Sequence, residues 1–492
     1  MKGRSTEPAA DLAPAAAPGL TTREREIRVP WGANGSLTLT LPAAGSLAGA
    51  DLEVIWPDLS GSLVDYPSAL ELALESPVAA ARLEHYLTAG ASVAIVVDDP
   101  SRWTPVREAL PIILRKLHAA GLAREDVTIC VGVGRHAAVD AEAMRRRLGN
   151  SIAAGYRCFS PPVDDLSAYA DLGRTPQGVP VRVFRPVAEA SLRILVGSVL
   201  PHLQAGFGGG YKLIFPGTSH RSTLGALHRQ GLEGRSSAAG LLGDDAAGNP
   251  MRQAIHSAAE RLGPCWSISH LVGGSGQVLQ VVAGHPERVQ DLLAAEARRR
   301  LQAPPAAPAD LVVAANDPWP GDPMQSFKVL LHHRAACRPG GVLAGLFWTD
   351  PDEIDRSFPI DVLRRIAATG SWGGWTIRRL LPIAQRIVAA TGSPAAFMLH
   401  WARELVVDRT VLVYSPPLCE RVGPRLGPVH LFADQAALWQ AAAAALQHRG
   451  RTGAADPLRI RVFPQGGLTY CGRTEDPSEG RRTEDGGRKK AK

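Results

Sequence analysis

Short apolar runs alternate along the chain with segments whose apolar positions repeat every three or four residues. Continuous apolar runs of this length predict strands buried on both faces, here residues 92–97, 127–131 and 194–199. The helical repeat predicts helices between and after these strands, at residues 106–117, 140–148, 249–262 and 285–301. Asp140 and Asn249 stand where helix caps are expected, and Pro250 occupies a first-turn position. Such alternation predicts an α/β fold with a mainly parallel sheet.

The same pattern restarts after a proline-rich stretch from Gln302 to Pro308. Beyond it we expect strands and helices at residues 311–315, 324–337, 342–348, 411–414, 434–448 and 458–463. The chain is therefore expected to form two α/β domains with mainly parallel sheets and an active-site cleft between them. The expected boundaries are an N-terminal tail at 1–25, a cofactor-binding and catalytic domain at 26–301, a linker at 302–309, a second domain at 310–470 and a C-terminal tail at 471–492.

Composition excludes several classes of protein. The length of 492 residues fits two domains, and a hydrophobic content of 45% is enough for a sizeable core. No run approaches the roughly 18 apolar residues of a membrane span, and the N-terminus lacks a signal-peptide core. The net charge of +7 is not gathered with aromatic residues into a patch. The six cysteines form no close pairs of the kind that bind zinc. We therefore expect a cytoplasmic protein without nucleic-acid or membrane partners.

The segment from Gly197 to Gly217 is the most informative part of the sequence. An apolar strand ends there, Pro201-His202 follows, and a glycine-rich loop leads to Lys212; its glycines are Gly206, Gly208, Gly209 and Gly210. Such a loop permits close approach of a ligand to the backbone, and its exposed amides can cradle an anion. The spacing to Lys212 does not fit a P-loop, so ATP hydrolysis is not supported. The alternative is a tight turn that carries a solvated lysine.

Two other strand ends carry polar residues, where α/β proteins place their ligands. Asp98 and Asp99 precede Arg102, which could clamp a carboxylate or pair with an aspartate on the surface. The second strand end reads Gly-Val-Gly-Arg-His, and it ends at His136. It resembles a dinucleotide fingerprint only in part, because no acidic residue follows about 20 positions later to bind a ribose.

Taken together, these segments resemble the nickel-dependent lactate racemase family over about residues 27–350. The strongest match is a signature of the form Pro-His, Gly-Phe-x-Gly-Gly-x-Lys, Pro-Gly, at Pro201, His202, Gly206, Phe207, Gly209, Gly210, Lys212, Pro216 and Gly217. Further matches in the same order are Asp99, Arg102, Pro105, Gly134, His136, His228, Asn249, Arg252, Gln325 and Lys328.

This resemblance implies a nickel-pincer nucleotide (pyridinium-3-thioamide-5-thiocarboxylic acid mononucleotide nickel) as the cofactor. Lys212 would tether it covalently through a thioamide, and His228 would be the nickel ligand from the protein. Further cofactor contacts are expected from Asp99, Gly206, Gly208, Gly209 and Gly210. Separate cofactor-biosynthesis proteins are expected as partners.

The implied activity is racemisation or epimerisation of a small-molecule 2-hydroxy acid. His136 and His202 would be the acid/base pair on opposite faces of the substrate, and Arg102, Gln325 and Lys328 would hold its carboxylate. The C–H bond beside a carboxylate is a very weak acid, so hydride removal coupled to loss of the hydroxyl proton is easier than deprotonation. A neutral histidine can take that proton near neutral pH. Returning the hydride to the other face requires a second histidine there.

The sequence departs from the family at the substrate side. Met324 replaces the usual tyrosine before Gln325, and Asp322 stands where asparagine is usual. Gly208 is often serine in the family. The loss of a tyrosine hydroxyl suggests a 2-hydroxy acid other than lactate, or a sugar acid. The alternatives are a different redox reaction with the same cofactor, a binding protein without turnover and, least supported, a nicotinamide dehydrogenase.

Overall fold

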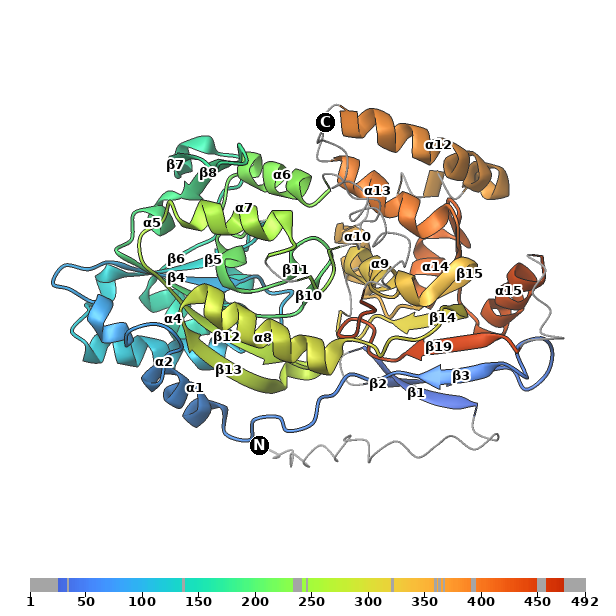
Figure 1. The fold of residues 1–492 in the computed structure, drawn as a ribbon, viewed down its shortest axis with the longest axis horizontal. Coiled ribbons are helices and arrows are strands. Elements are labelled where there is room, and N and C mark those ends of the chain that lie inside the picture. Colours follow the sequence, from blue (N-terminus) through green and yellow to red (C-terminus); the bar gives the residue numbers. More distant parts are fainter. Residues whose placement is uncertain are drawn as a thin grey trace, which may run out of the picture.

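The computed structural model of the chain describes residues 25–32, 35–134, 138–232, 241–244, 247–319, 323–357, 361, 364–365, 368–390, 395–448 and 457–472. Two α/β domains lie next to each other, each built around its own mainly parallel sheet (Figure 1). The predicted fold class is therefore confirmed. Among the described helices, none has the length and apolar character that a membrane crossing requires.

The sheet of the N-terminal domain has six strands in the order β13-β12-β9-β4-β5-β6. Neighbouring strands are parallel except for the antiparallel edge pair β12 and β13. The strands are β4 (Val93–Asp98), β5 (Val127–Gly132), β6 (Arg157–Phe159), β9 (Leu192–Ser198), β12 (Cys265–Val272) and β13 (Val278–Gly284). A hairpin, β7 (Tyr169–Arg174) and β8 (Pro180–Phe184), lies outside this sheet.

Helices cover both faces of this sheet, which is why its central strands are apolar without interruption. In β4, Ile95 and Val97 join the core under α1 and α2, whereas Ala94 and Val96 join the core under α6 and α7. The helices of the domain are α1 (Tyr66–Glu75), α2 (Val106–Ala119), α3 (Ala141–Leu148), α4 (Asn150–Gly155), α5 (Arg185–Ala188), α6 (Arg221–Gln230), α7 (Pro250–Ala259) and α8 (Pro286–Leu301).

The predicted helix caps are confirmed. The Asp140 side chain accepts the backbone N–H of Ala143 at 2.7 Å, and α3 begins directly after it. Asn249 caps α7 by accepting the N–H of Arg252 at 2.9 Å. These caps satisfy backbone donors that have no partner within the helix.

The sheet of the C-terminal domain has seven strands in the order β17-β18-β16-β15-β14-β19-β3. Its strands are β3 (Asp51–Val54), β14 (Ala309–Ala315), β15 (Cys337–Leu346), β16 (Thr410–Tyr414), β17 (Arg425–Leu426), β18 (Val429–Phe432) and β19 (Arg459–Phe463). Its helices are α9 (Pro323–His332), α10 (Pro351–Ser357), α12 (Gly370–Ala390), α13 (Ala395–Val406), α14 (Pro416–Val422) and α15 (Gln435–His448). The helix expected at 324–337 ends earlier than expected, at His332. Strand β15 also starts earlier than expected, at Cys337, because Pro339-Gly340-Gly341 within it is a sequence typical of a turn.

The expected start of the N-terminal domain at residue 26 differs from the structure. Strand β3 pairs in parallel with β19 at the edge of the C-terminal sheet. The hairpin of β1 (Glu26–Trp31) and β2 (Gly35–Thr40) packs in the same core as β14 and α15. Alternation along the chain could not show this, because β3 and its partner are about 400 residues apart in sequence. The tails expected at 1–25 and 471–492 lie largely outside the described residues.

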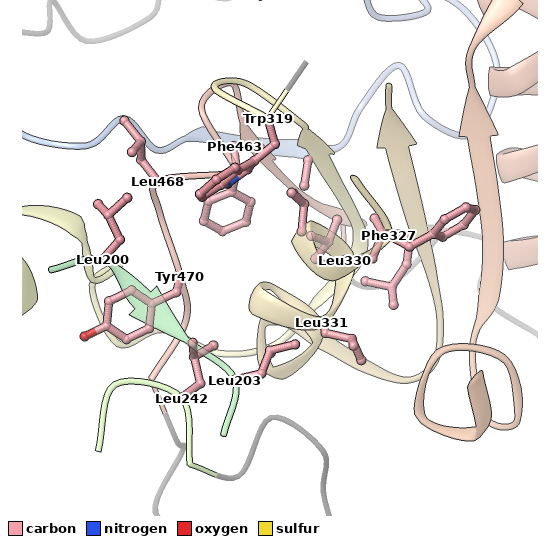
Figure 2. Packing of buried hydrophobic residues seen from close by; sticks show 14 of the residues in the cluster. Leu200, Leu203, Leu242, Trp319, Phe327, Leu330, Leu331, Phe463, Leu468 and Tyr470 are labelled. Carbon is pink, nitrogen blue, oxygen red and sulfur yellow. The ribbon is translucent and has the colours of Figure 1, made fainter. Parts of the chain in front are cut away.

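The two domains share one hydrophobic core at their junction (Figure 2). Leu200, Leu203 and Phe207 of the N-terminal domain pack in this core with residues of the C-terminal domain, among them Trp319, Phe327, Leu330, Leu468 and Tyr470. Tyr470 is 1% exposed, and its ring meets the ring of Phe207 edge-on at 6.2 Å. The Tyr470 hydroxyl donates to Gln302 Oε1 at 3.2 Å. The chain thus returns from the C-terminal sheet to the glycine-rich loop.

We expect Tyr470→Ala to lower the free energy of unfolding by about 3–5 kcal/mol, since it removes a fully buried ring and leaves a cavity at the junction. Urea unfolding followed by circular dichroism would measure the change. Leu166→Ala is the matched control, because Leu166 is 49% exposed and its loss should change little. A loss below about 1 kcal/mol for Tyr470→Ala would show that this contact does not hold the junction together.

Candidate functional site

The turn after β4 lies at the junction of the domains. The Asp99 carboxylate accepts the N–H of Ser101 at 2.8 Å, and the N–H of Arg102 donates to the Asp99 carbonyl at 3.1 Å. The Arg102 guanidinium lies 5.1 Å from the ring centre of Trp319 in the C-terminal domain. Next to it, Trp103 Nε1 donates to the Pro318 carbonyl at 3.0 Å. These contacts fix Arg102 beside the other domain, where a substrate could reach it.

Arg147 of α3 stabilises this turn through its side chain, a role that the sequence did not reveal. Its guanidinium forms an ion pair with Asp98 and donates to the Asp98 carbonyl at 3.1 Å. It also donates to the carbonyls of Arg102 at 3.0 Å and Thr104 at 3.2 Å. The Thr104 hydroxyl donates to the second oxygen of Asp98 at 2.5 Å. Burial raises the pKa of Asp98, and Arg147 opposes that shift.

The end of β5 lies against the segment that follows Lys212. The N–H of Gly134 donates to the Gly217 carbonyl at 2.9 Å. A Cβ atom at Gly132 would come within 3.0 Å of the Leu213 carbonyl oxygen. His136 itself lies outside the described residues. The chain that leads to His136 is therefore next to the Lys212 segment, as the prediction for this histidine requires.

The glycine-rich loop is folded tightly against the protein. Gly206, Gly209 and Gly210 have φ values of +70°, +75° and +56°, which favour glycine. A Cβ at Gly206 would lie 2.2 Å from the Asp244 carbonyl oxygen, and one at Gly209 would lie 2.9 Å from Val199 Cγ2. Gly208 has no positive φ, and a Cβ there would lie 3.3 Å from the Ser198 carbonyl oxygen, a milder restriction. Packing within the chain therefore explains three of the four glycines without reference to a ligand.

Arg252 of α7 supports the loop from inside the domain. It is 3% exposed and donates to the Phe207 carbonyl and, at 3.1 Å, to the Ala205 carbonyl. Burial lowers the pKa of Arg252 to about 10. Asn249 Nδ2 donates to the Gln204 carbonyl at 3.0 Å. The Asn-Pro-x-Arg motif thus fixes the loop backbone, a role that the sequence analysis did not assign to it.

Lys212 lies half-buried in a short 3₁₀ turn, Gly210–Leu213, that follows the loop. Burial lowers the pKa of its amine to about 7, and the positive charges of Arg102, Arg252 and Lys328 add to the effect. Asp99 opposes this shift. An amine with such a pKa is largely unprotonated just above neutral pH and can act as a nucleophile. The half-buried side chain differs in this respect from the fully solvated lysine of the alternative.

His202 is part of the same group of charges. Burial is the main reason why the pKa of His202 lies well below its usual value. The charges of four residues lower it further: Lys212, Lys328, Arg102 and His228. His202 Nδ1 accepts the N–H groups of Gln204 at 3.3 Å and Ala205 at 3.1 Å. A neutral imidazole held in this way carries its proton on Nε2.

The C-terminal domain contributes residues from α9. Gln325 is 6% exposed and accepts a hydrogen bond from Lys328 Nζ at 2.7 Å, one turn away on the same helix. The Lys328 ammonium lies 5.4 Å from the ring centre of Trp401 in α13, another neighbour that the sequence did not indicate. The positive charge of Lys328 lowers the pKa values of both His202 and Lys212, so this part of α9 lies near the site.

His228 lies half-buried in the last turn of α6, and its backbone carbonyl accepts Gln204 Nε2 at 3.1 Å. Within the described ranges, no three His, Cys, Asp or Glu side chains gather into a metal site. A metal here would need donors from a bound group in addition to His228. The charges of His228 and Lys212 both lower the pKa of His202, so both residues lie near that imidazole.

Arg147→Met should lower the free energy of unfolding by about 3–5 kcal/mol, because it leaves the buried Asp98 carboxylate without its cation. Adding Asp98→Asn should recover part of the loss, and urea unfolding of both single variants and the double variant would give the coupling. Arg146→Met is the matched control on the same helix, since the Arg146–Glu142 pair is exposed and contributes about 0.5 kcal/mol or less. If the effects of the two single variants simply add, Arg147 and Asp98 do not stabilise the fold as a pair.

Acetylation of Lys212 by acetic anhydride should rise through a midpoint near pH 7, since only the unprotonated amine reacts. Peptide mass spectrometry across pH 5–10 would follow it. Lys116 is the internal control: burial lowers its pKa, but bonds to Glu75 and Glu84 outweigh burial and raise it. In Lys328→Met the Lys212 midpoint should move to higher pH. A wild-type midpoint equal to that of Lys116 would show that the cluster does not act on Lys212.

Comparison with known sequences agrees with this geometry. Residues 48–240, which include Asp99, His202, Lys212 and His228, match the lactate racemase N-terminal domain. A protein named lactate racemase from Thermoanaerobacterium thermosaccharolyticum is 26% identical over 274 residues, 55% of this chain and 63% of that protein. Another from Lactiplantibacillus plantarum is 24% identical over 280 residues, 56% of this chain and 64% of that protein. The matches thus span less than two thirds of either relative.

Solved structures show the same fold. The lactate racemase apoprotein from Thermoanaerobacterium thermosaccharolyticum superposes with a TM-score of 0.72 at 18% identity, covering 91% of this chain and all of that chain (100%). A crystal structure of a Thermotoga maritima protein gives a TM-score of 0.55 at 14% identity, covering 82% of this chain and 97% of that one. The chain is thus similar to lactate racemases over its N-terminal domain, and it shares its fold with the lactate racemase apoprotein.

Proposed function

We propose that this protein is a racemase or epimerase of a 2-hydroxy acid that works with a lysine-tethered nickel-pincer nucleotide. The observation that carries the proposal is the convergence of Lys212, His202, Arg102 and Lys328, from both domains, in one electrostatic group. A nucleophilic amine, a neutral imidazole and two cations are part of what such a reaction needs from the protein, and His136 is proposed as the second imidazole. Relatives named lactate racemase support the same reaction class.

Arg102 and Lys328 are the groups that bind the substrate carboxylate. They approach the site from different domains, and Gln325 is bonded to Lys328. A carboxylate between them would offset the positive charges that depress the pKa values of His202 and Lys212. Its negative charge is therefore favoured at this point, and it fixes the carbon to be inverted.

His202 holds a proton at Nε2, since the backbone bonds occupy Nδ1. Its low pKa keeps the ring neutral, so Nε2–H can donate a hydrogen bond to a substrate oxygen. His136 is the proposed partner on the opposite face of the substrate. One histidine would accept the hydroxyl proton as the C–H bond breaks. The other, in its protonated form, would return a proton to the same oxygen as the C–H bond re-forms on the opposite face, and the roles would exchange for the opposite enantiomer.

Lys212 is the proposed attachment point of the cofactor, and His228 is the proposed nickel ligand from the protein. When bound, the nickel-pincer nucleotide supplies a reversible hydride acceptor. The unprotonated Lys212 amine can form the covalent bond near neutral pH. The tightly folded glycine loop fixes the backbone that leads to Lys212. The Asp99 carboxylate partly offsets the positive charges around the Lys212 amine. Cofactor-biosynthesis proteins are the proposed source of the group.

The proposed substrate is a 2-hydroxy acid other than lactate, or a sugar acid. Met324 precedes Gln325 in the first turn of α9, where the family usually has a tyrosine. Methionine offers no hydroxyl to a polar substrate group, and it adapts to shapes that a rigid ring excludes.

Protein co-expressed with nickel and the cofactor-making enzymes should gain several hundred daltons by denaturing mass spectrometry, and Lys212→Ala should not. Lys116→Ala is the matched control and should keep the adduct, since Lys116 pairs with Glu75 and Glu84 and is not among the charges that act on His202 or Lys212. No adduct on the wild type, with nickel and the maturation enzymes verified, would refute the tether.

The loaded protein should racemise single enantiomers of 2-hydroxy acids without added nicotinamide. We expect His202→Asn to lower kcat about 100-fold or more while leaving the adduct in place. Arg102→Gln should raise KM chiefly, because it removes carboxylate binding. Faster turnover of lactate than of larger 2-hydroxy acids would reject the substrate assignment, and a requirement for stoichiometric NAD would reject the reaction.

A further inference from the structure

The outward face of α12 is apolar and exposed. Its side chains Trp372, Trp375, Leu380, Ile383 and Ile387 are 75%, 56%, 55%, 56% and 61% exposed. At about 100° per residue they fall within an arc of roughly 140°, which is one face of the helix. Single exposed apolar residues are ordinary, but five large ones on one helix face form a patch of the kind that marks an interaction site.

The opposite face of α12 already packs against the protein. Gly374 and Leu381 are buried there, and a Cβ at Gly374 would lie 2.8 Å from the Gly427 carbonyl oxygen. Helix α13 also lies on this side, so α12 forms the outer edge of the C-terminal domain (Figure 1). Helix α12 thus has two apolar faces: one packs against the protein, and the other faces outward.

The charges of the segment that contains α12 have one sign. Residues 362–403 contain six arginines and no aspartate or glutamate, although acidic residues nearly balance basic ones in the chain as a whole. Arg379 and Arg386 are exposed on the outward side of α12. The Arg379 guanidinium lies 5.2 Å from the ring centre of Trp375. Apolar side chains flanked by arginines call for a partner with an apolar interior and anionic groups at its surface.

We propose that α12 is an interfacial helix through which this protein binds reversibly to membranes rich in anionic lipids. Trp372 and Trp375 would lie at the headgroup level, and Ile383 and Ile387 would enter the acyl boundary. Arg379 and Arg386 would pair with lipid phosphates. This proposal revises the expectation that the protein has no membrane partner, and it is independent of the proposed reaction.

The charges argue against a second copy of the chain as the occupant. Two copies of α12 paired face to face would bring Arg379 and Arg386 of both copies together, with no carboxylate on α12 to neutralise them. The helix is also convex and peripheral, which suits a flat surface better than the groove of another protein.

The test is co-sedimentation of the full chain with vesicles of phosphatidylcholine alone or mixed with phosphatidylglycerol. We expect binding to the anionic vesicles, little binding to the neutral ones, and weakening as salt is raised. The variant Trp372→Ala/Trp375→Ala/Ile383→Ala should bind at least about tenfold more weakly, because it removes the apolar anchors. Arg379→Gln/Arg386→Gln should lose the preference for anionic vesicles.

The matched control is Leu72→Ala/Leu292→Ala, which removes exposed leucines (69% and 50%) from the N-terminal domain and should bind as the wild type does. If the triple variant fails to fold by circular dichroism, Ile383→Glu tests the same face with one exposed change. Absent wild-type binding, or equal binding by the apolar-face variants, would overturn the proposal. Light scattering that shows a dimer lost in the triple variant, without vesicle binding, would assign the face to a second copy.

Discussion

The packing of Phe207 against Tyr470 is the contact on which the arrangement of the site depends. Phe207 is 2% exposed, with the Tyr470 ring on one side and the Arg298 guanidinium 5.3 Å from its ring centre. It belongs to the glycine-rich loop, so its burial in the shared core ties that loop to the C-terminal domain. Interiors are densely packed and resist small displacements. Lys212, a few residues on, is thereby fixed relative to the charges of α9.

The electrostatic character of the site follows from how the carboxylates near it are used. Arg147 forms an ion pair with Asp98, so the negative charge of the Asp98 carboxylate is neutralised by that arginine. Asp99 is the carboxylate that acts on Lys212 against three cations. Partial burial makes each of these charges act more strongly than it would in water. The result is a site that favours an unprotonated lysine, a neutral histidine and an anionic ligand at the same time.

The glycines show how structural and functional demands can coincide. Gly206 and Gly209 are required by the carbonyl oxygens and side chains that surround them, whatever binds nearby. The same tight folding lets Arg252 reach the loop carbonyls from inside the domain and add its charge to the environment of Lys212. A loop that is rigid before a ligand arrives loses less entropy when the ligand binds. Packing therefore also prepares the chemistry.

The local features were determined by the sequence alone. The resemblance to a known family implied that Arg102, His202, Lys212, Gln325 and Lys328 share one site, and their roles stay predictions. Apolar runs identified the central strands, and caps identified the starts of α3 and α7. These features depend on neighbours a few residues apart, so a linear pattern is enough to show them. His136 stays a prediction, because it lies outside the described residues. The tertiary structure alone decided that β3 joins the sheet of the C-terminal domain, that Arg147 and Arg252 support the site loops, and that one face of α12 stays exposed. Each of these is a relation between distant segments, and only the folded chain brings such segments together.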